Sequence, residues 1–142
     1  MHSNRSTLPV HNIFHLLSSD RRMDEAAGIR IATVLEDPAH AYYITDIAPG
    51  KSVNPHFHRD GDEVYIILGG NGVIHTWGVE DPSSVQSQAI EGGSVFRISP
   101  GMVHQLENNG AQPLVLLFAC APEHLGSDRV VVASARSDKD AA

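Results

Sequence analysis

The sequence lacks several features that would place it in a specialised class of protein. It has a single cysteine, Cys120, which excludes an intramolecular disulfide framework and a zinc site built from several cysteines. No apolar run reaches the roughly 20 residues of a membrane span, and the first residues lack the apolar core of a signal peptide. We therefore expect a cytoplasmic protein that does not interact with a membrane.

Positive charge is also scarce. The chain has 10 Lys and Arg residues against 17 Asp and Glu residues, for a net charge of −7. A protein that binds nucleic acid needs a face rich in Lys and Arg to meet the phosphates, and here the basic residues are scattered. The charge pattern therefore argues against a nucleic-acid partner.

The composition is that of an ordinary globular protein, with 42% hydrophobic and 19% charged residues in 142 positions. This length fits one domain with one core. Residues 10–20 carry apolar side chains at 13, 14, 16 and 17, which predicts a short helix or an arm lying on the core. We divide the chain into an N-terminal arm (1–28), a β-domain (29–134) and a flexible tail (135–142).

Short runs rich in Val, Ile, Tyr and Phe recur about every ten residues after the arm, separated by turn signals such as PG at 49–50 and DPSS at 81–84. No segment is long enough for a crossover helix, so a parallel α/β sheet is not expected. The pattern predicts an all-β sandwich or barrel. The expected strands are 30–35, 41–48, 53–58, 63–68, 72–77, 94–98, 103–107, 113–119 and 129–134.

The stretch NPHFHRDGDEVYIILGG, residues 54–70, places candidate metal ligands beside an apolar run. Side chains alternate faces along a strand, so His56 and His58 point the same way and Phe57 points opposite. A hairpin-like reversal at RDGD would bring Glu63 back on the adjacent strand. His104, at the start of a later strand, is a fourth candidate.

Three imidazoles and a carboxylate form a mixed nitrogen and oxygen donor set. It suits one divalent transition metal, namely Fe, Mn, Ni, Co, Cu or Zn, and is too rich in nitrogen for a dedicated Ca²⁺ or Mg²⁺ site. Four protein ligands leave two positions of an octahedral ion for water, oxygen or substrate. Open positions are the property expected of a catalytic site.

Two motifs resemble those of the cupin superfamily. Residues 50–70 resemble the first cupin motif through Gly50, His56, His58, Glu63 and Gly70. Residues 93–108 resemble the second through Gly93, Gly101, His104 and Asn108. Ser99 departs from the proline that many cupins have at this position, and Pro100 beside it keeps the turn rigid. The flanking strand-like runs are consistent with the rest of a cupin barrel.

The resemblance implies a jelly-roll barrel, or double-stranded β-helix, with His56, His58, Glu63 and His104 as metal ligands inside it, and a homodimer built through edge strands. It also implies a metal-dependent enzyme that acts on a small or medium oxygenated substrate (an enol, a carbonyl compound or an aromatic). Small single-domain cupins include dioxygenase-like members and isomerase-, lyase- or cyclase-like members, polyketide-cyclase-like proteins among them. The alternative is a non-catalytic module that binds a metal or a metabolite.

Glu63, Tyr65 and His75 are the candidate catalytic residues. Tyr65 has the parity of Glu63, so its ring faces either the metal or the apolar core. His75 is either a base near the metal or a residue of the outer barrel face. Arg97 interrupts an apolar strand; it would anchor a substrate carboxylate or phosphate if it faced inward, and we favour an outward position beside an acid.

The remaining histidines lie outside the two motifs. His11 and His15 lie four residues apart, a spacing that can also bind a metal, and we favour a position on the polar face of the arm. His2, His40 and His124 are expected at the surface. Cys120 ends an apolar run and is predicted to be a small buried hydrophobic residue.

Overall fold

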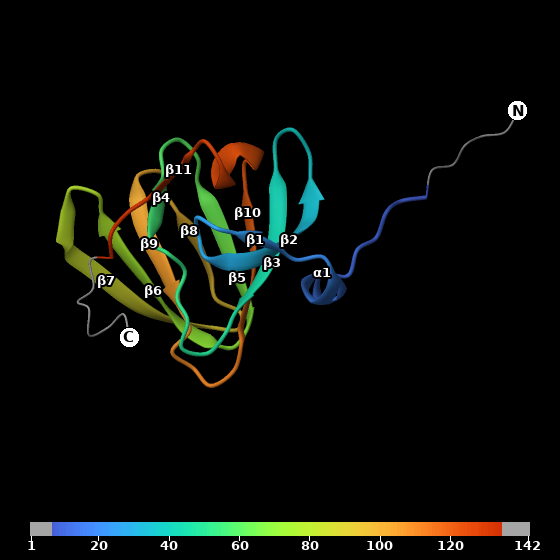
Figure 1. Cartoon of the computed structure of the whole chain (residues 1–142), viewed down its shortest axis with the longest axis horizontal. Helices are drawn as coiled ribbons and strands as arrows, with labels where there is room; N and C mark the ends of the chain where they lie inside the picture. Colours follow the sequence, from blue (N-terminus) through green and yellow to red (C-terminus); the bar gives the residue numbers. More distant parts are fainter. Residues whose placement is uncertain (1–6, 135–142) are drawn as a thin grey trace, which may run out of the picture.

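The computed structural model of the chain describes residues 7–134, which form one short α-helix, one short 3₁₀ helix and two β-sheets (Figure 1). Helix α1 (Ile13–Ser19) begins after Asn12, whose side chain accepts hydrogen bonds from the backbone N–H groups of Phe14 and His15. The other bounds are β1 (Arg22–Asp24), β2 (Ile29–Glu36), β3 (Ala41–Ile47), β4 (His56–His58), β5 (Glu63–Gly69), β6 (Asn71–Gly78), β7 (Asp81–Glu91), β8 (Val95–Ile98), β9 (Met102–Glu107), β10 (Leu114–Cys120), η1 (Pro122–Leu125) and β11 (Arg129–Val131).

The strands form two facing antiparallel sheets. The six-stranded sheet has the order β1-β2-β3-β10-β5-β8, and the five-stranded sheet has the order β11-β4-β9-β6-β7. Figure 1 shows them as opposing layers, with α1 lying against β2 and β3. The predicted all-β jelly-roll fold is therefore confirmed.

The apolar core lies between the two sheets and follows from alternation along the strands. In β10 every second residue is buried, including Leu116 and Phe118. Tyr65 and Ile67 of β5 pair with these two residues and are buried on the same face. Burying each such side chain stabilises the fold by about 1.5–3 kcal/mol. At one end of this core the apolar side chains give way to Glu63 and a group of histidines.

Strand β7 is the main departure from the sequence prediction. The turn predicted at 81–84 is wrong, because the turn lies at Val79 and Glu80 and β7 runs from Asp81 to Glu91. It pairs only with β6 and forms the edge of its sheet, so most of its side chains are exposed. An edge strand with exposed Ser and Gln side chains lacks the hydrophobic alternation by which strands are recognised.

The N-terminal arm also differs in part from its prediction. The short helix is present, but β1 within the arm pairs with β2, so the six-stranded sheet begins before residue 29. Leu8 and Val10, which precede α1, and Phe14 within it are exposed. The predicted tail at 135–142 lies outside the described residues. Of the helices in residues 7–134, none has the length and hydropathy needed to cross a membrane.

Candidate metal centre

The structure brings the four predicted metal ligands together inside the barrel. Strand β4 carries His56 and His58, and β9 carries His104, which pairs directly with His56. Glu63 begins β5 in the opposite sheet. The turn between β4 and β5 therefore passes from one sheet to the other, and the predicted hairpin between adjacent strands is wrong. Ligand atoms of all four residues lie within 4.8 Å of one another.

Hydrogen bonds orient two of the imidazoles toward the centre of this group. Nδ1 of His56 donates to the backbone carbonyl of Asn54 at 2.8 Å, and Nδ1 of His104 donates to that of Met102 at 3.1 Å. Each bond fixes the tautomer that leaves Nε2 free for a metal. Nε2 of His104 is buried and has no hydrogen-bond partner in the described part of the chain. Since an unpaired buried polar atom is costly, a metal ion fits this donor set.

The charge states of His56, His58 and Glu63 also suit a metal. Burial lowers the pKa of His56 to about 3 and lowers the pKa of His58. Burial raises the pKa of Glu63, but the neighbouring imidazoles of His104, His124 and His58 outweigh this effect and hold it well below its usual range. Neutral imidazoles and an ionised carboxylate are the forms that bind metal ions.

His124 contacts two members of this group, His58 and Glu63, and its predicted surface position is wrong. The side chain is fully buried, and its ring stacks on that of His58 with 3.2 Å between the ring centroids. Its Nε2 lies 2.6 Å from Oε2 of Glu63. The sequence separation of 61 residues between these partners explains why no local spacing indicated the contact.

Tyr65 faces inward beside the four ligands, stacked on Phe96, with its ring centroid 6.0 Å from that of His104. Burial, followed by the neighbouring Glu63 carboxylate, raises the pKa of Tyr65 well above its usual value. Next to this ring lies a small cavity of about 20 Å³, with Phe118 and Arg129 also in its lining. This volume holds about one water-sized group.

The structure does not bring His75 to the metal centre. Thr76 pairs with His104, so His75 lies on the outer face of the five-stranded sheet. Its ring nitrogens contact Ser87 at 2.7 Å and Glu107 at 2.6 Å. The sequence left open whether His75 lies near the metal or on the outer face of the barrel, and the structure places it on the outer face.

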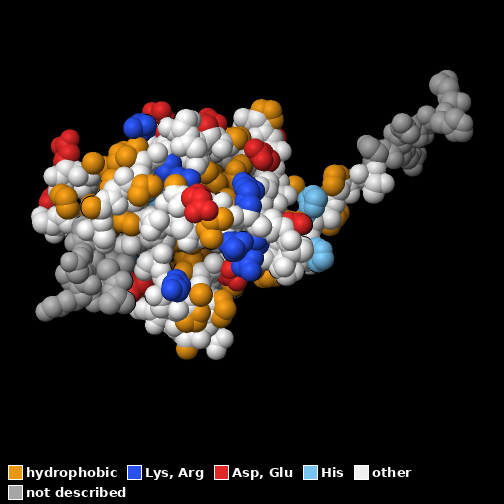
Figure 2. Space-filling model, in the orientation of Figure 1, with side chains coloured by type: hydrophobic (Ala, Val, Ile, Leu, Met, Phe, Trp, Pro, Cys, Tyr) orange, Lys and Arg blue, Asp and Glu red, His pale blue; other side chains and the backbone are white. Residues whose placement is uncertain are grey.

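The other predicted side-chain positions can be compared directly. Arg97 faces outward as favoured, and its acidic partner is Asp62, at 3.4 Å. His11, His15 and His40 are exposed and Cys120 is buried, as expected. The histidines visible in Figure 2 lie beside the N-terminal arm. His2 lies outside the described residues.

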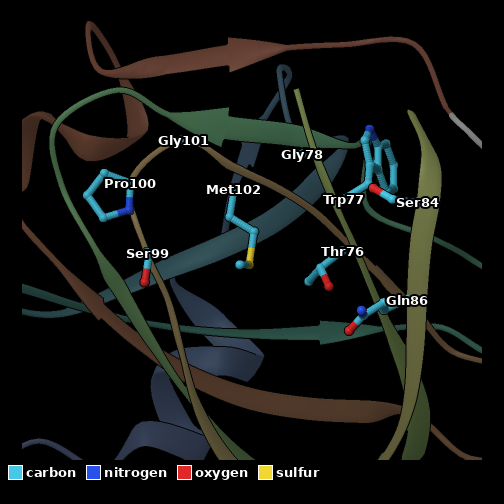
Figure 3. A pocket seen from close by; sticks show the side chains of 9 residues that line it. All are labelled: Thr76, Trp77, Gly78, Ser84, Gln86, Ser99, Pro100, Gly101 and Met102. Carbon is cyan, nitrogen blue, oxygen red and sulfur yellow. The ribbon is translucent and has the colours of Figure 1, made fainter. Parts of the chain in front are cut away.

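A larger hollow of about 390 Å³ lies near the end of β6 (Figure 3). Ser99 and Pro100 line one side and Gln86 the other, with Met102 between them. None of the side chains that line it within the described chain is an acid, a base or a histidine. The side chains of this hollow therefore offer no group suited to acid–base or metal chemistry.

Two facing antiparallel sheets with three histidines and a glutamate between them define a jelly-roll barrel with a candidate transition-metal site. The Cupin domain family matches residues 43–120. The chain belongs to the cupin family.

The chain is similar to parts of a germin-like protein and of an oxalate-binding protein. The chain is 34% identical to germin-like protein 5-1 of Oryza sativa subsp. japonica over 82 residues, which are 57% of the chain but only 35% of that protein. It is 31% identical to the oxalate-binding protein of Thermotoga maritima over 93 residues, covering 66% of the chain and 71% of that protein. A crystal structure of a predicted oxalate decarboxylase from T. maritima superposes with a TM-score of 0.57 at 28% identity, covering 66% of this chain and 79% of that one.

Proposed function

We propose that this cupin is a metal-dependent enzyme that holds one divalent transition metal with His56, His58, Glu63 and His104. Its substrate would be a small oxygenated molecule, such as an enol, a carbonyl compound or an aromatic, bound beside the metal. The convergence of four buried donor side chains, with Nε2 of His104 unpaired, carries this proposal. When bound, the metal would supply electrophilic polarisation of a substrate oxygen or, if it is redox-active, chemistry with O2.

The surrounding residues define what reaches the site. Tyr65 and Phe118 form an apolar wall that excludes water from the donor atoms. Arg129 lines the same cavity and provides a positive charge, although Asp24 binds it at 2.6 and 2.8 Å. A small substrate with a carboxylate group would meet the positive charges of the metal ion and of Arg129. The name of the oxalate-binding relative supports this substrate class. A substrate larger than one water-sized group requires these side chains to move.

The reaction type depends on which metal is bound, and two classes of reaction are proposed. Iron with consumption of O2 would indicate a dioxygenase-like enzyme. Manganese, nickel, cobalt or zinc without O2 consumption would indicate an isomerase-, lyase- or cyclase-like enzyme, with polyketide-cyclase-like members included. The same four ligands accept all of these ions, so the protein must be assayed with each.

A non-catalytic binding module is the second candidate. It is favoured by the relative named as an oxalate-binding protein, of which the chain covers 71%. A binding module would retain oxalate or a similar chelating acid unchanged, whereas the enzyme would convert it. Chromatography of the recovered small molecule after prolonged incubation separates the two candidates.

We also propose a cytoplasmic homodimer. The exposed apolar side chains of Leu8, Val10 and Phe14 on the arm support association with a second copy. Edge strands β7 and β8 offer unpaired backbone groups for the same purpose. Sedimentation equilibrium should give the dimer mass, and a monomer at micromolar concentration would contradict it.

The first test of the metal site is metal analysis of protein purified without added metal, beside the His104→Ala variant. We expect one equivalent of metal in the unaltered protein and a loss of at least tenfold in the variant, because Nε2 of His104 has no other partner. Circular dichroism checks that the variant is folded. Full metal occupancy in folded His104→Ala would contradict the proposed site.

A further inference from the structure

The four proposed ligands differ in how the fold holds them. His56 and His104 are each oriented by a hydrogen bond to a backbone carbonyl. Neither ring nitrogen of His58 has a hydrogen-bond partner in the described chain. The Glu63 carboxylate is surrounded by histidines, and its shortest contact is with Nε2 of His124 at 2.6 Å. The two ligands without a backbone partner are therefore the two that His124 touches.

His124 contacts them in two different ways. Its ring lies almost parallel to that of His58, with 18° between the planes and 3.2 Å between the centroids. Its Nε2–H donates to Oε2 of Glu63. The stacking contact restricts the plane of the His58 ring, and the hydrogen bond restricts the carboxylate. A hydrogen bond to a charged acceptor is stronger than a neutral one.

The position of His124 is itself fixed by the chain around it. It lies in η1, where its backbone N–H donates to the carbonyl of Ala121. Asp128 accepts hydrogen bonds from the backbone N–H groups of Asp60 and Gly61, and its Oδ2 lies 3.6 Å from Nδ1 of His124. A Cβ atom at Gly61 would lie 2.9 Å from the same Nδ1. Residues 122–128 thus pack on the turn that joins β4 to β5.

We propose that His124 is a positioning residue of the metal centre, which orients His58 and Glu63 and so determines how tightly the metal binds. The inference rests on the metal site proposed above. His124 is not one of the four residues whose ligand atoms lie within 4.8 Å of one another. Its role is to hold two ligands in place from outside the coordination sphere, where removal of such partners lowers metal affinity by roughly 10- to 100-fold.

The test is a titration with Mn²⁺ alone, in which electron paramagnetic resonance measures the free and bound ion. His124→Phe keeps an aromatic ring against His58 but removes the N–H donor to Glu63. We expect the Kd for Mn²⁺ to rise about 10- to 100-fold, and the spectrum of the bound ion to change because the carboxylate is less restrained. His40→Phe is the matched control, since His40 is exposed and belongs to neither group of candidate metal donors, and the Kd of this variant should not change.

Two further variants separate positioning from packing. His124→Gln provides an amide N–H for Glu63, so it should recover part of the affinity that His124→Phe loses. If His124→Phe does not fold, Gly61→Ala takes its place, because the added methyl group displaces the His124 ring without removing any donor. Gly61→Ala should weaken Mn²⁺ binding while the protein, checked by circular dichroism, stays folded.

A folded His124→Phe variant with unchanged Mn²⁺ affinity and spectrum would overturn the inference. So would a fall from two bound ions to one, since His58, His124 and Asp128 also form a close group of donors and His124 would then be a ligand itself. The His104→Ala variant distinguishes failure of the positioning role from failure of the proposed metal site. If His104→Ala binds Mn²⁺ normally, the proposed site is wrong; if it does not, while His124→Phe does, only the positioning role is wrong.

Discussion

At the scale of single residues, the sequence identified histidines of the metal site by their neighbours along the chain. It could not identify those that reach the site only through contacts with distant residues. His56 and His58 share a face because they are two residues apart in a strand, so their convergence was predictable. His124 reaches Glu63 across 61 residues, and nothing near it in sequence indicated that contact. Asp128, four residues further on, approaches its ring in the structure, but this spacing does not point to Glu63.

Asn108 illustrates a motif residue whose role is structural. The second cupin motif ends at this residue, four residues after His104, and the two would share a face if the strand continued past Glu107. In the structure its Nδ2 donates to the carbonyls of Ile47 and Gln112, and its Oδ1 accepts from the N–H of Gly110. These bonds hold the loop between β9 and β10. Matching the motif therefore identified the residue but not its function.

At the scale of elements, prediction succeeded where one face of a strand is buried. Strands β5 and β10 alternate between buried and partly exposed residues, and both were predicted to within one residue at each end. Strand β7 was missed because it lies at a sheet edge and exposes most of its side chains. Burial of one face produces the alternation of apolar and polar residues by which a strand is recognised. A strand with little buried surface, such as β7, therefore lacks this alternation.

The turn between β5 and β6 allows a prediction with an internal control. Gly70 has φ +87° and Gly50 has φ +79°, a region that costs other residues about 1–2 kcal/mol. A Cβ atom at Gly70 would collide with the carbonyl oxygen of Pro113, whereas one at Gly50 would meet nothing within 4 Å. Gly70→Ala should therefore lower the free energy of unfolding by about 1–3 kcal/mol more than Gly50→Ala, because of this overlap.

Urea unfolding of both glycine variants, without metal, measures the difference. Equal losses of stability would mean that the backbone around Pro113 relaxes and that only the positive φ angle matters. A larger loss for Gly50→Ala would contradict the steric argument altogether.

At the scale of the whole molecule, the alternating pattern predicted a barrel but not which strands meet. The expected hairpin between β4 and β5 does not form, because the turn crosses between the sheets and places His58 and Glu63 on opposite walls. Strand order depends on contacts between distant segments, such as β3 with β10 and β5 with β10. The family resemblance implied that the four ligands meet, and composition and spacing alone did not.

One ion pair connects the two sheets at their edges. Arg129 of β11 binds Asp24 of β1 through two hydrogen bonds of 2.6 and 2.8 Å, and both side chains are less than a tenth exposed (7% and 9%). Strands β1 and β11 are the edge strands of opposite sheets, so the pair joins an N-terminal segment to a C-terminal one. Arg129 also lines the small cavity beside the metal ligands.

Removing one partner of this pair should destabilise the protein strongly. Asp24→Ala leaves a buried guanidinium without its counter-charge, which costs about 3–5 kcal/mol. The exposed pair of Arg97 and Asp62 is the control, and Asp62→Ala should cost at most about 1 kcal/mol. In the double variant Asp24→Ala/Arg129→Met no buried charge is left, so it should be more stable than Asp24→Ala alone. Urea unfolding of the metal-free proteins gives the free energy of unfolding of all three variants. If Asp24→Ala costs no more than Asp62→Ala, water reaches Arg129, and the pair does not hold the two sheets together.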